Sequence, residues 1–364
     1  MPTPRKNPEA MAALRRGLLS WYEVNRRDLP WRGSHDPYAI WVSEIMLQQT
    51  RVAVVVDRFR AFLQRFPTLV SLALAPEQEV LALWSGLGYY RRARMLHKAA
   101  QFVLSHNHGN LPATADELRT LPGIGEYTAA AIASIAFGES VAVVDGNVER
   151  VLCRRSGWEA DKRSGGAELK RKIAALAARL LDSARPGDFN QALMELGATV
   201  CLPRNPRCTA CPLHSACKTR GEHKTRPRPP MLSREVSHAL SVRASATAAR
   251  GREVLLEQRL ATETVMPGLW ELPLLRASAV PEDELRMTVR HSIMQVNYYV
   301  RIRTVFEDDA EEMTVAGGVR RWAPLAEAAG MALTGLTRKV LSRAHLLPAA
   351  PLDTIVPRAA GDGF

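Results

Sequence analysis

Four of the five cysteines lie in one short stretch, CLPRNPRCTACPLHSAC. Cys201, Cys208, Cys211 and Cys217 are separated by six, two and five residues. In a reducing compartment, clustered thiols are more often metal ligands than disulfides. A zinc ribbon usually needs two C-x-x-C pairs or an added pair of histidines, whereas a [4Fe–4S] cluster accepts four thiolates from one looping segment. The spacing therefore favours a [4Fe–4S] cluster over zinc and over two disulfides.

Two carboxylates could carry acid–base chemistry. Glu44, in AIWVSEIML, shares a helical face with apolar residues, where burial would raise its pKa and let it donate a proton near neutral pH. Asp145, in VAVVDGNVERV, precedes a glycine and a helix, where backbone N–H groups would keep it ionised to stabilise a developing cation. The alternatives are a Glu44 paired with Arg32 or Arg51, and an Asp145 that only caps its helix.

A Pro-Gly-Ile-Gly turn between two helical segments could bind phosphate. Gly123 and Gly125, in LRTLPGIGEYTAAAIASIAFG, allow a tight turn whose backbone N–H groups meet the positive end of the next helix. This pattern is typical of a helix-hairpin-helix, and an ordinary glycine turn is the alternative. The net charge of +12 favours a polyanion as partner, although a basic surface alone would give the same charge.

The elements that would position these residues fall into two parts. A chain of 364 residues is long enough for two domains. Residues 8–220 have a helical period, and in DPYAIWVSEIML Asp36 and Pro37 stand where helix starts prefer them. Charge and proline predict a linker at 221–235, and an alternating period over 236–347 predicts an α+β domain.

The sequence indicates no membrane partner. No stretch approaches the ~18 apolar residues of a membrane helix, and the start MPTPRKNPEA has no apolar h-region. We therefore expect a cytoplasmic protein, associated with the nucleoid if it is bacterial. We expect Cys153, outside the cysteine cluster, to be a small buried apolar residue.

Residues 13–220 resemble the helix-hairpin-helix DNA glycosylases with an iron–sulfur loop, the endonuclease III superfamily. Within it, the segments LPWR, DPYAIWVSEIMLQQTRV, GLGYYRRARMLHKAA, LPGIGEYTAAAI and VVDGNVERVL look like the adenine DNA glycosylase family, MutY. The resemblance implies a mainly α first domain with a helix-hairpin-helix and a [4Fe–4S] loop. Endonuclease III carries a Schiff-base lysine two residues after the second glycine of the hairpin, and here that residue is Tyr127. A monofunctional glycosylase is therefore implied.

The resemblance also implies a role for each matching residue. Glu44 would protonate adenine N7 and later activate water, Asp145 would stabilise the oxocarbenium ion, and Tyr127 and Asn147 would support Asp145. The positions around the extruded adenine are Arg27, Leu29, Trp31, Arg32, Val52 and Gln191. The residues that would contact the DNA, by insertion near the opposing base or along the strand, are Gln49, Thr50, Tyr89, Gly123 and Gly125. The cluster ligands would be Cys201, Cys208, Cys211 and Cys217.

The second domain resembles the MutT-like (Nudix-fold) domain of the same family. The similarity lies in GREVLLEQR, MPGLWELP and RRWAPLAEA, and the metal-binding signature of Nudix hydrolases is missing. Diphosphate hydrolysis is therefore not expected. The family recognises 8-oxoguanine through a Phe-Ser-His loop, where this chain has Ile293, Met294 and Gln295. We expect a weaker preference for 8-oxoguanine as a result.

These features predict a monomeric base excision repair glycosylase that flips and excises adenine. Its partner would be double-stranded DNA with adenine opposite 8-oxoguanine or guanine. One alternative is a thymine mismatch glycosylase of the same superfamily, against which LPWR and the MutT-like domain argue. The other is a non-catalytic iron–sulfur DNA-binding protein that senses redox state, against which the presence of both Glu44 and Asp145 argues.

Overall fold

The computed structural model divides into two compact units. The described residues are 8–158, 166–223, 230–245, 251–275, 285–293, 295–312 and 319–347. The first unit comprises residues 1–74 and 95–226, and the second comprises residues 75–94 and 227–364. No helix within the described ranges is long and apolar enough to cross a bilayer.

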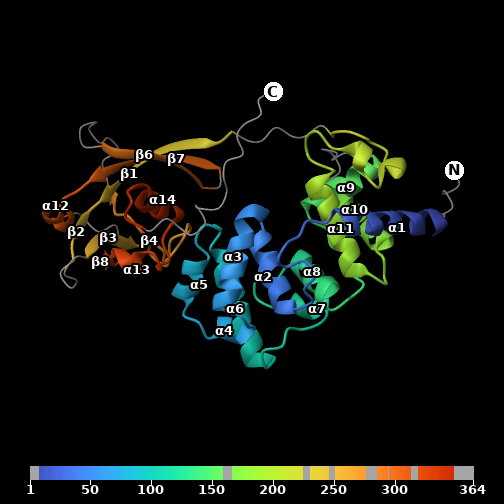
Figure 1. Ribbon diagram of the computed structural model, residues 1–364, viewed down its shortest axis with the longest axis horizontal. Helices are drawn as coiled ribbons and strands as arrows, with labels where there is room; N and C mark the ends of the chain where they lie inside the picture. The colour runs from blue at the N-terminus through green and yellow to red at the C-terminus, as the bar shows by residue number, and fades with distance from the viewer. Residues whose placement is uncertain are drawn as a thin grey trace. The chain divides into compact units, whose positions relative to one another are not determined.

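The first unit is helical (Figure 1), as its sequence period predicts. Its elements are α1 (Pro8–Asn25), α2 (Pro37–Leu47), α3 (Val52–Arg65), α4 (Leu69–Ala73), α7 (Ala115–Leu118), α8 (Glu126–Ala136), α9 (Gly146–Ser156), α10 (Ala167–Leu180), α11 (Pro186–Thr199) and the single 3-10 turns η1 (Cys208–Ala210) and η2 (His214–Ala216). Helix α5 (Glu77–Leu83) belongs to the second unit, and α6 (Arg91–His106) begins there and continues into the first.

Local sequence fixes where the helices that carry the site begin. Asp36 caps α2 by accepting hydrogen bonds from the backbone N–H of Tyr38 and Ala39, and Pro37 follows at the first helical position. Asp145 caps α9, and Gly157 ends that helix with a φ of 67°, in the left-handed region that favours glycine. The predicted start of α2 and the predicted cap of α9 are therefore both confirmed.

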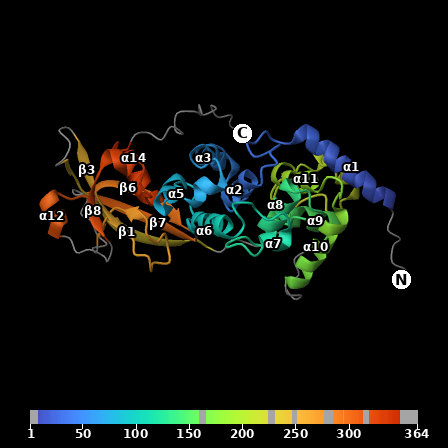
Figure 2. The same cartoon turned by 90° about the horizontal axis from the view of Figure 1, so that it is seen from below.

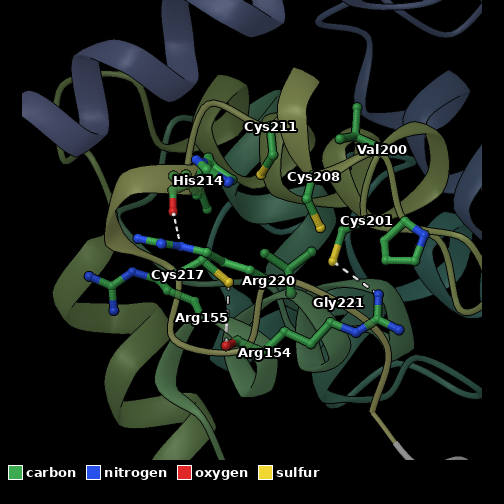
Figure 3. A pocket seen from close by; sticks show the side chains of 13 residues that line it. Arg154, Arg155, Val200, Cys201, Cys208, Cys211, His214, Cys217, Arg220 and Gly221 are labelled. Carbon is green, nitrogen blue, oxygen red and sulfur yellow. Dashed lines mark hydrogen bonds between the residues drawn. The ribbon is translucent and has the colours of Figure 1, made fainter.

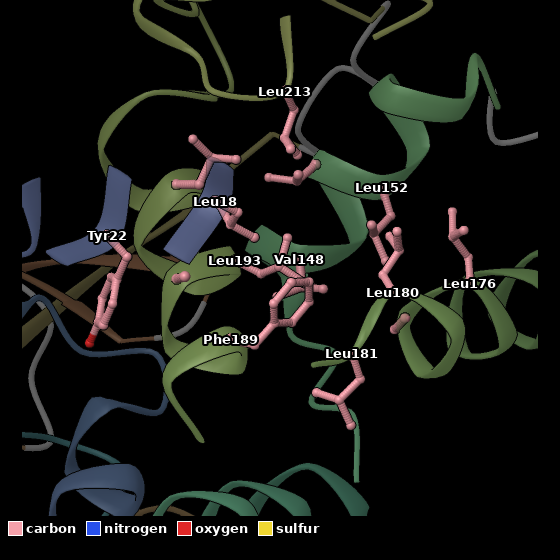
Figure 4. Close-up of a cluster of buried hydrophobic side chains, with 14 of the residues drawn as sticks. Leu18, Tyr22, Val148, Leu152, Leu176, Leu180, Leu181, Phe189, Leu193 and Leu213 are labelled. Atoms are coloured by element: carbon pink, nitrogen blue, oxygen red, sulfur yellow. The ribbon is translucent and has the colours of Figure 1, made fainter. Parts of the chain in front are cut away.

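Helix α11 lies at the centre of the packing in the first unit. It contacts α1, α8 and α9 (Figure 2). Its apolar face joins a continuous cluster of buried side chains (Figure 4), which includes Leu18, Tyr22, Val148, Leu152, Leu180, Phe189 and Leu193. Burial of each large apolar side chain stabilises the fold by roughly 1.5–3 kcal/mol. The cluster also contains Cys153, which is buried as expected.

Two glycines let α11 approach its neighbours closely. A Cβ at Gly187 would lie 2.7 Å from the carbonyl oxygen of Ser134 in α8. A Cβ at Gly197 would lie 2.6 Å from the Cβ of Asn147 and 3.0 Å from its carbonyl oxygen. Only a residue without a side chain fits at these contacts. The distance between α11 and α9 is therefore set at Asn147, beside a predicted catalytic residue.

The second unit is an α+β domain, as predicted. One sheet has the strand order β5-β1-β7-β6, in which β1 and β7 are parallel and β6 pairs antiparallel with β7. In the other sheet β3 lies between β2 and β4 and also pairs with β8. The elements are β1 (Leu232–Leu240), β2 (Val242–Ala244), β3 (Arg252–Gln258), β4 (Trp270–Glu271), β5 (Leu274–Leu275), β6 (Leu285–Ile293), β7 (Val296–Thr304), α12 (Glu307–Glu312), β8 (Arg320–Pro324), α13 (Leu325–Ala328) and α14 (Gly335–Arg343).

The unit boundaries differ from the expected domain boundaries in two places. Strand β1 begins at Leu232, inside the expected linker 221–235. Residues 75–94 were expected in the first domain, but they belong to the second unit. Hydrogen bonds explain this, because Tyr90 donates to the carbonyl oxygen of Leu333 and Arg338 donates to the hydroxyl of Ser85.

We expect Gly197→Ala to destabilise the first unit by about 1–3 kcal/mol, because the added methyl group would meet backbone atoms that cannot move aside. The matched control is Gly17→Ala in α1, where a Cβ meets nothing within 4 Å. That change should stabilise the protein by about 0.5–1 kcal/mol. Urea unfolding followed by far-UV circular dichroism measures both effects, and a Gly197→Ala protein as stable as its parent contradicts the close contact.

Candidate active site

A cavity of about 820 Å³ brings together residues from α2, α8, α11, the start of α9 and the loop between α1 and α2. Of the predicted catalytic and DNA-contacting residues, all but one line it. They are Arg27, Leu29, Trp31, Arg32, Glu44, Gln49, Thr50, Val52, Gly123, Gly125, Tyr127, Asp145, Asn147 and Gln191. The exception is Tyr89, which belongs to the second unit.

Glu44 is buried on α2, with 6% of its surface exposed. One carboxyl oxygen accepts a hydrogen bond from the hydroxyl of Tyr127 on α8 at 2.7 Å. Burial raises the pKa of Glu44 to about 7, and the charge of Asp145 adds to this effect, against the Tyr127 hydrogen bond and the charge of Arg32. The predicted rise in pKa is confirmed. Such a carboxyl group holds a proton near neutral pH and can donate it.

The contact of Tyr127 differs from the expected one. Its hydroxyl was expected to support Asp145, but it donates to Glu44. The reason is that α8 packs against α2, which carries Glu44. Burial and the charge of Glu44 raise the pKa of Tyr127 well above its usual value, so the phenol stays protonated and remains a donor.

Asp145 is oriented by two donors. Its Oδ1 accepts a hydrogen bond from the backbone N–H of Val148 at 2.7 Å, and its Oδ2 accepts one from Asn147 Nδ2 at 2.8 Å. The carboxylate therefore caps α9 and also lines the cavity. The expected contact of Asn147 with Asp145 is confirmed. Because Asp145 lines the cavity while it caps α9, its capping role does not exclude a chemical one.

Arg27 and Arg32, the two arginines of the cavity, pair with an acid that was not predicted from the sequence. Glu195 on α11 has no exposed surface and accepts from Arg27 Nε at 2.7 Å and from Arg32 Nη2 at 2.7 Å. Arg32 is therefore bound to Glu195, and Arg51 is exposed, so neither arginine pairs with Glu44 as the alternative had it. The position of Glu195 among apolar residues of NQALMELGATVC was the available signal, the same one that identified Glu44.

Other lining residues were also missed. Gln48 donates to the hydroxyl of Thr128 at 3.2 Å, which ties the end of α2 to α8, and Met194 accepts a weak hydrogen bond from Tyr127 at its sulfur. No pattern in the sequence distinguishes these residues. Trp31, which also lines the cavity, packs edge-on against Phe59, with ring centroids 5.4 Å apart. That contact fixes the orientation of the indole ring.

The residues expected to contact DNA have unusual backbone conformations. Gly123 has a φ of 77°, and a Cβ there would lie 2.6 Å from the Cβ of Met95, so the hairpin turn requires glycine. Gly125 is extended and caps α8. Gln49 and Tyr89 have φ values of 55° and 47°, which is uncommon for residues with a side chain and typical of functional sites.

The four clustered cysteines surround one hollow (Figure 3). All four are free thiols, which rules out disulfides among them in this structure. Arg154 is buried and donates to the sulfur of Cys201 at 3.5 Å and to the carbonyl oxygens of Leu202 and Pro203. Positive charge against the thiols suits ligands that bind metal as thiolates. Within the described ranges, no three His, Cys, Asp or Glu side chains are arranged to hold a metal ion. Four thiols around one hollow are nevertheless the donor set that a [4Fe–4S] cluster accepts.

Hydrogen bonds join this cysteine loop to Asp145. Arg150 on α9 donates to the carbonyl oxygen of Cys201 at 2.8 Å and to Asn147 Oδ1 at 2.8 Å. Asn147 in turn donates to Asp145. The orientation of Asp145 therefore depends on the position of the loop.

In the second unit, the expected lesion-reading segment lies at the β6–β7 turn. Ile293 ends β6, Gln295 lies in the turn, and Met294 lies outside the described residues. The hydroxyl of Ser292 donates to Asn297 at 2.7 Å within the hairpin. Ser292 is therefore engaged with its own hairpin.

The chain is similar in sequence to known DNA repair proteins. Residues 42–176 match the family described as HhH-GPD superfamily base excision DNA repair protein. The chain is 51% identical over 219 residues to the adenine DNA glycosylase of Homo sapiens, covering 58% of this chain and 40% of that protein. It is 40% identical over 207 residues to the adenine DNA glycosylase of Buchnera aphidicola subsp. Baizongia pistaciae, covering 56% and 57%.

Among solved structures, a thermostable thymine-DNA glycosylase is similar with a TM-score of 0.53 and 29% identity, over 58% of this chain and 97% of that one. The similarity between this chain and that structure is a similarity of fold. The matched region spans about half the length of the curated relatives.

The stability of Glu44→Gln relative to the parent should depend on pH. The raised folded-state pKa means that the protonated Glu44 stabilises the parent fully below about pH 4.5 and that this stabilisation is lost as the pH rises through about 7. Glutamine stays neutral, so the variant should gain about 3 kcal/mol relative to the parent between about pH 4.5 and pH 7 and little more above that. Urea unfolding at each pH measures the difference. The exposed Glu149, changed to Gln, is the control and should show no such trend.

Proposed function

Since residues 42–176 match the family described as HhH-GPD superfamily base excision DNA repair protein, we propose that this chain is a monofunctional adenine DNA glycosylase. It acts, on this proposal, as a monomer on double-stranded DNA with adenine opposite 8-oxoguanine or guanine. The observation that carries the proposal is the pair of carboxyl groups in one cavity. Glu44 is buried and protonatable, and Asp145 is held by two hydrogen-bond donors.

The proposed reaction divides between these two groups. Glu44 gives its proton to N7 of the flipped adenine, the bond between C1′ and N9 breaks, and its electron pair leaves with the base. The carboxylate of Asp145 stabilises the oxocarbenium ion left on the sugar. Water then attacks C1′ and Glu44 takes up its proton. The products are free adenine and an abasic site.

The residues around the acid fit this division. The hydroxyl of Tyr127 donates to Glu44 and fixes the direction of the carboxyl group. A phenol cannot form a Schiff base with the sugar, so Tyr127 agrees with a reaction that stops at base release. Trp31 offers an aromatic surface on which a flipped base can stack.

A thymine glycosylase remains the second candidate, because a thymine-DNA glycosylase shares the fold. The acid favours adenine, since thymine has no ring nitrogen that corresponds to N7. A protonatable Glu44 can therefore assist the departure of adenine by protonating N7, and it cannot assist the departure of thymine in this way.

We also propose a [4Fe–4S] cluster held by Cys201, Cys208, Cys211 and Cys217. When bound, it would supply a rigid framework for the loop. Arg204 and Arg207 lie exposed within that loop and are available to DNA phosphates. The second unit would read the opposing base, with a weaker preference for 8-oxoguanine because Ile293, Met294 and Gln295 replace a Phe-Ser-His loop.

Base release from duplexes with 8-oxoG:A, G:A and G:T pairs tests the proposed activity. We expect free adenine from the first two and no thymine from the third. Glu44→Gln and Asp145→Asn should each lower the single-turnover rate by about 10²–10⁴-fold, because each group acts on the base or on the sugar cation. Affinity for the duplex should stay within about threefold, since phosphate contacts dominate it. A variant that releases adenine at nearly the parent rate removes its residue from the mechanism.

Metal analysis tests the proposed cluster. Protein purified without oxygen should contain about four iron and about four sulfide per chain and absorb broadly near ~400 nm. Cys153→Ser is the control and should leave these values unchanged, because Cys153 lies in the apolar core. Stoichiometric zinc without iron would overturn the assignment.

A further inference from the structure

Glu195 is a buried carboxylate that binds two arginines of the cavity. It accepts hydrogen bonds from Arg27 Nε and Nη2 at 2.7 and 2.9 Å, from the backbone N–H of Arg27 at 3.1 Å, and from Arg32 Nη2 at 2.7 Å. The side chain of Glu195 has no exposed surface, whereas that of Arg27 is 38% exposed. One fully buried acid on α11 therefore anchors two cations on the loop between α1 and α2.

This pairing fixes how Arg27 faces the cavity. A guanidinium group is planar, so two parallel hydrogen bonds to one carboxylate set its orientation. The bonds to Glu195 use Nε and Nη2, so Nη1 is not taken up by this carboxylate, and Arg27 lines the cavity. Arg32 is fixed on both sides, because its Nη1 also donates to the hydroxyl of Tyr22 at 2.6 Å.

The same pairing sets the charge that Glu44 meets. Tyr127 from α8, Asp145 at the start of α9, and Arg32 from the loop act on Glu44, and the charge of Arg32 favours its ionised form. Hydrogen bonds from Arg27 and the charge of Arg32 lower the pKa of Glu195 despite its burial, so it is ionised at neutral pH. The negative charge of Glu195 offsets the positive charge of Arg32, which acts on Glu44.

We infer that Glu195 is a positioning residue for the excision step: it orients Arg27 in the cavity that would receive the flipped base, and it offsets the charge of Arg32 that acts on Glu44. The inference rests on the proposed function. Glu195 does not touch the reacting atoms in this assignment, because its oxygens are taken up by the two guanidinium groups and a backbone N–H.

The first test is the pH profile of single-turnover adenine release by Glu195→Gln. Removing the negative charge leaves Arg32 without its counter-charge, so Arg32 stabilises the Glu44 carboxylate more strongly. The alkaline limb of the profile, where Glu44 loses its proton, should move down by roughly one pH unit. The rate near neutral pH should fall by about 10- to 100-fold because Arg27 is misplaced, while duplex affinity should stay within about threefold.

Two further variants separate charge from orientation. Glu195→Asp keeps the charge, so the alkaline limb should return toward that of the parent. Arg27→Lys also keeps the charge but loses the planar fork, so its rate should fall about tenfold with the limb unmoved. Both can be tested even where Glu195→Gln fails to fold. The control is Asp188→Asn, which removes an exposed ion pair with Arg185 on the same helix and should match the parent.

Three results would overturn the inference. Glu195→Gln could keep the parent rate and profile, or it could lose rate with the alkaline limb unmoved, which would mean that Glu195 serves the fold alone. Where that variant does not fold, parent-like rates in both Glu195→Asp and Arg27→Lys count against the inference. If the parent protein releases no adenine, that result contradicts the proposed function and not only the role of Glu195.

Discussion

The burial of charge on α11 is the constraint on which the candidate site depends. Glu195 lies at the contact between α11 and the α1–α2 loop with no exposed surface, and it is ionised because two guanidinium groups hold it. Breaking such a buried pair typically costs about 3–5 kcal/mol, a large share of the ~5–15 kcal/mol that stabilises a typical domain. The loop that carries Leu29 and Trp31 is therefore held to α11 by an interaction that the fold cannot easily lose.

The second buried acid, Glu44, has a neutral partner where Glu195 has two cations. Among the residues that the structure describes, no cation donates a hydrogen bond to Glu44, and the phenol of Tyr127 donates to it. Burial then favours its protonated form, in which it can act as a proton donor. Two buried glutamates in one cavity thus hold different protonation states, because arginine binds one and tyrosine binds the other. The close approach of α11 to α9 at Gly197 keeps Asn147 beside Asp145 and completes the arrangement.

Features fixed by local sequence were predictable, whereas those fixed by distant partners were not. The caps at Asp36 and Asp145, the turn at Gly123 and the grouping of four cysteines follow from spacing along the chain. The burial of Glu44 followed from its helical face, and that of Glu195 was open to the same argument. Which acid each arginine meets, and that Tyr127 faces Glu44 and not Asp145, depends on how whole helices pack. The start of β1 within a charged, proline-rich stretch likewise depends on its pairing with β7.

The separation of Arg32 and Glu195 by 163 residues has a consequence for biosynthesis. The chain emerges from the ribosome from its N-terminus, so α1 and the arginine-bearing loop are made long before α11. Until α11 has emerged, Arg27 and Arg32 lack the carboxylate that holds them, and the cavity lacks one wall. The cysteine loop follows α11 directly. The nascent protein thus gains the full lining of the cavity and its four clustered thiols together, in the final stage of translating the first unit.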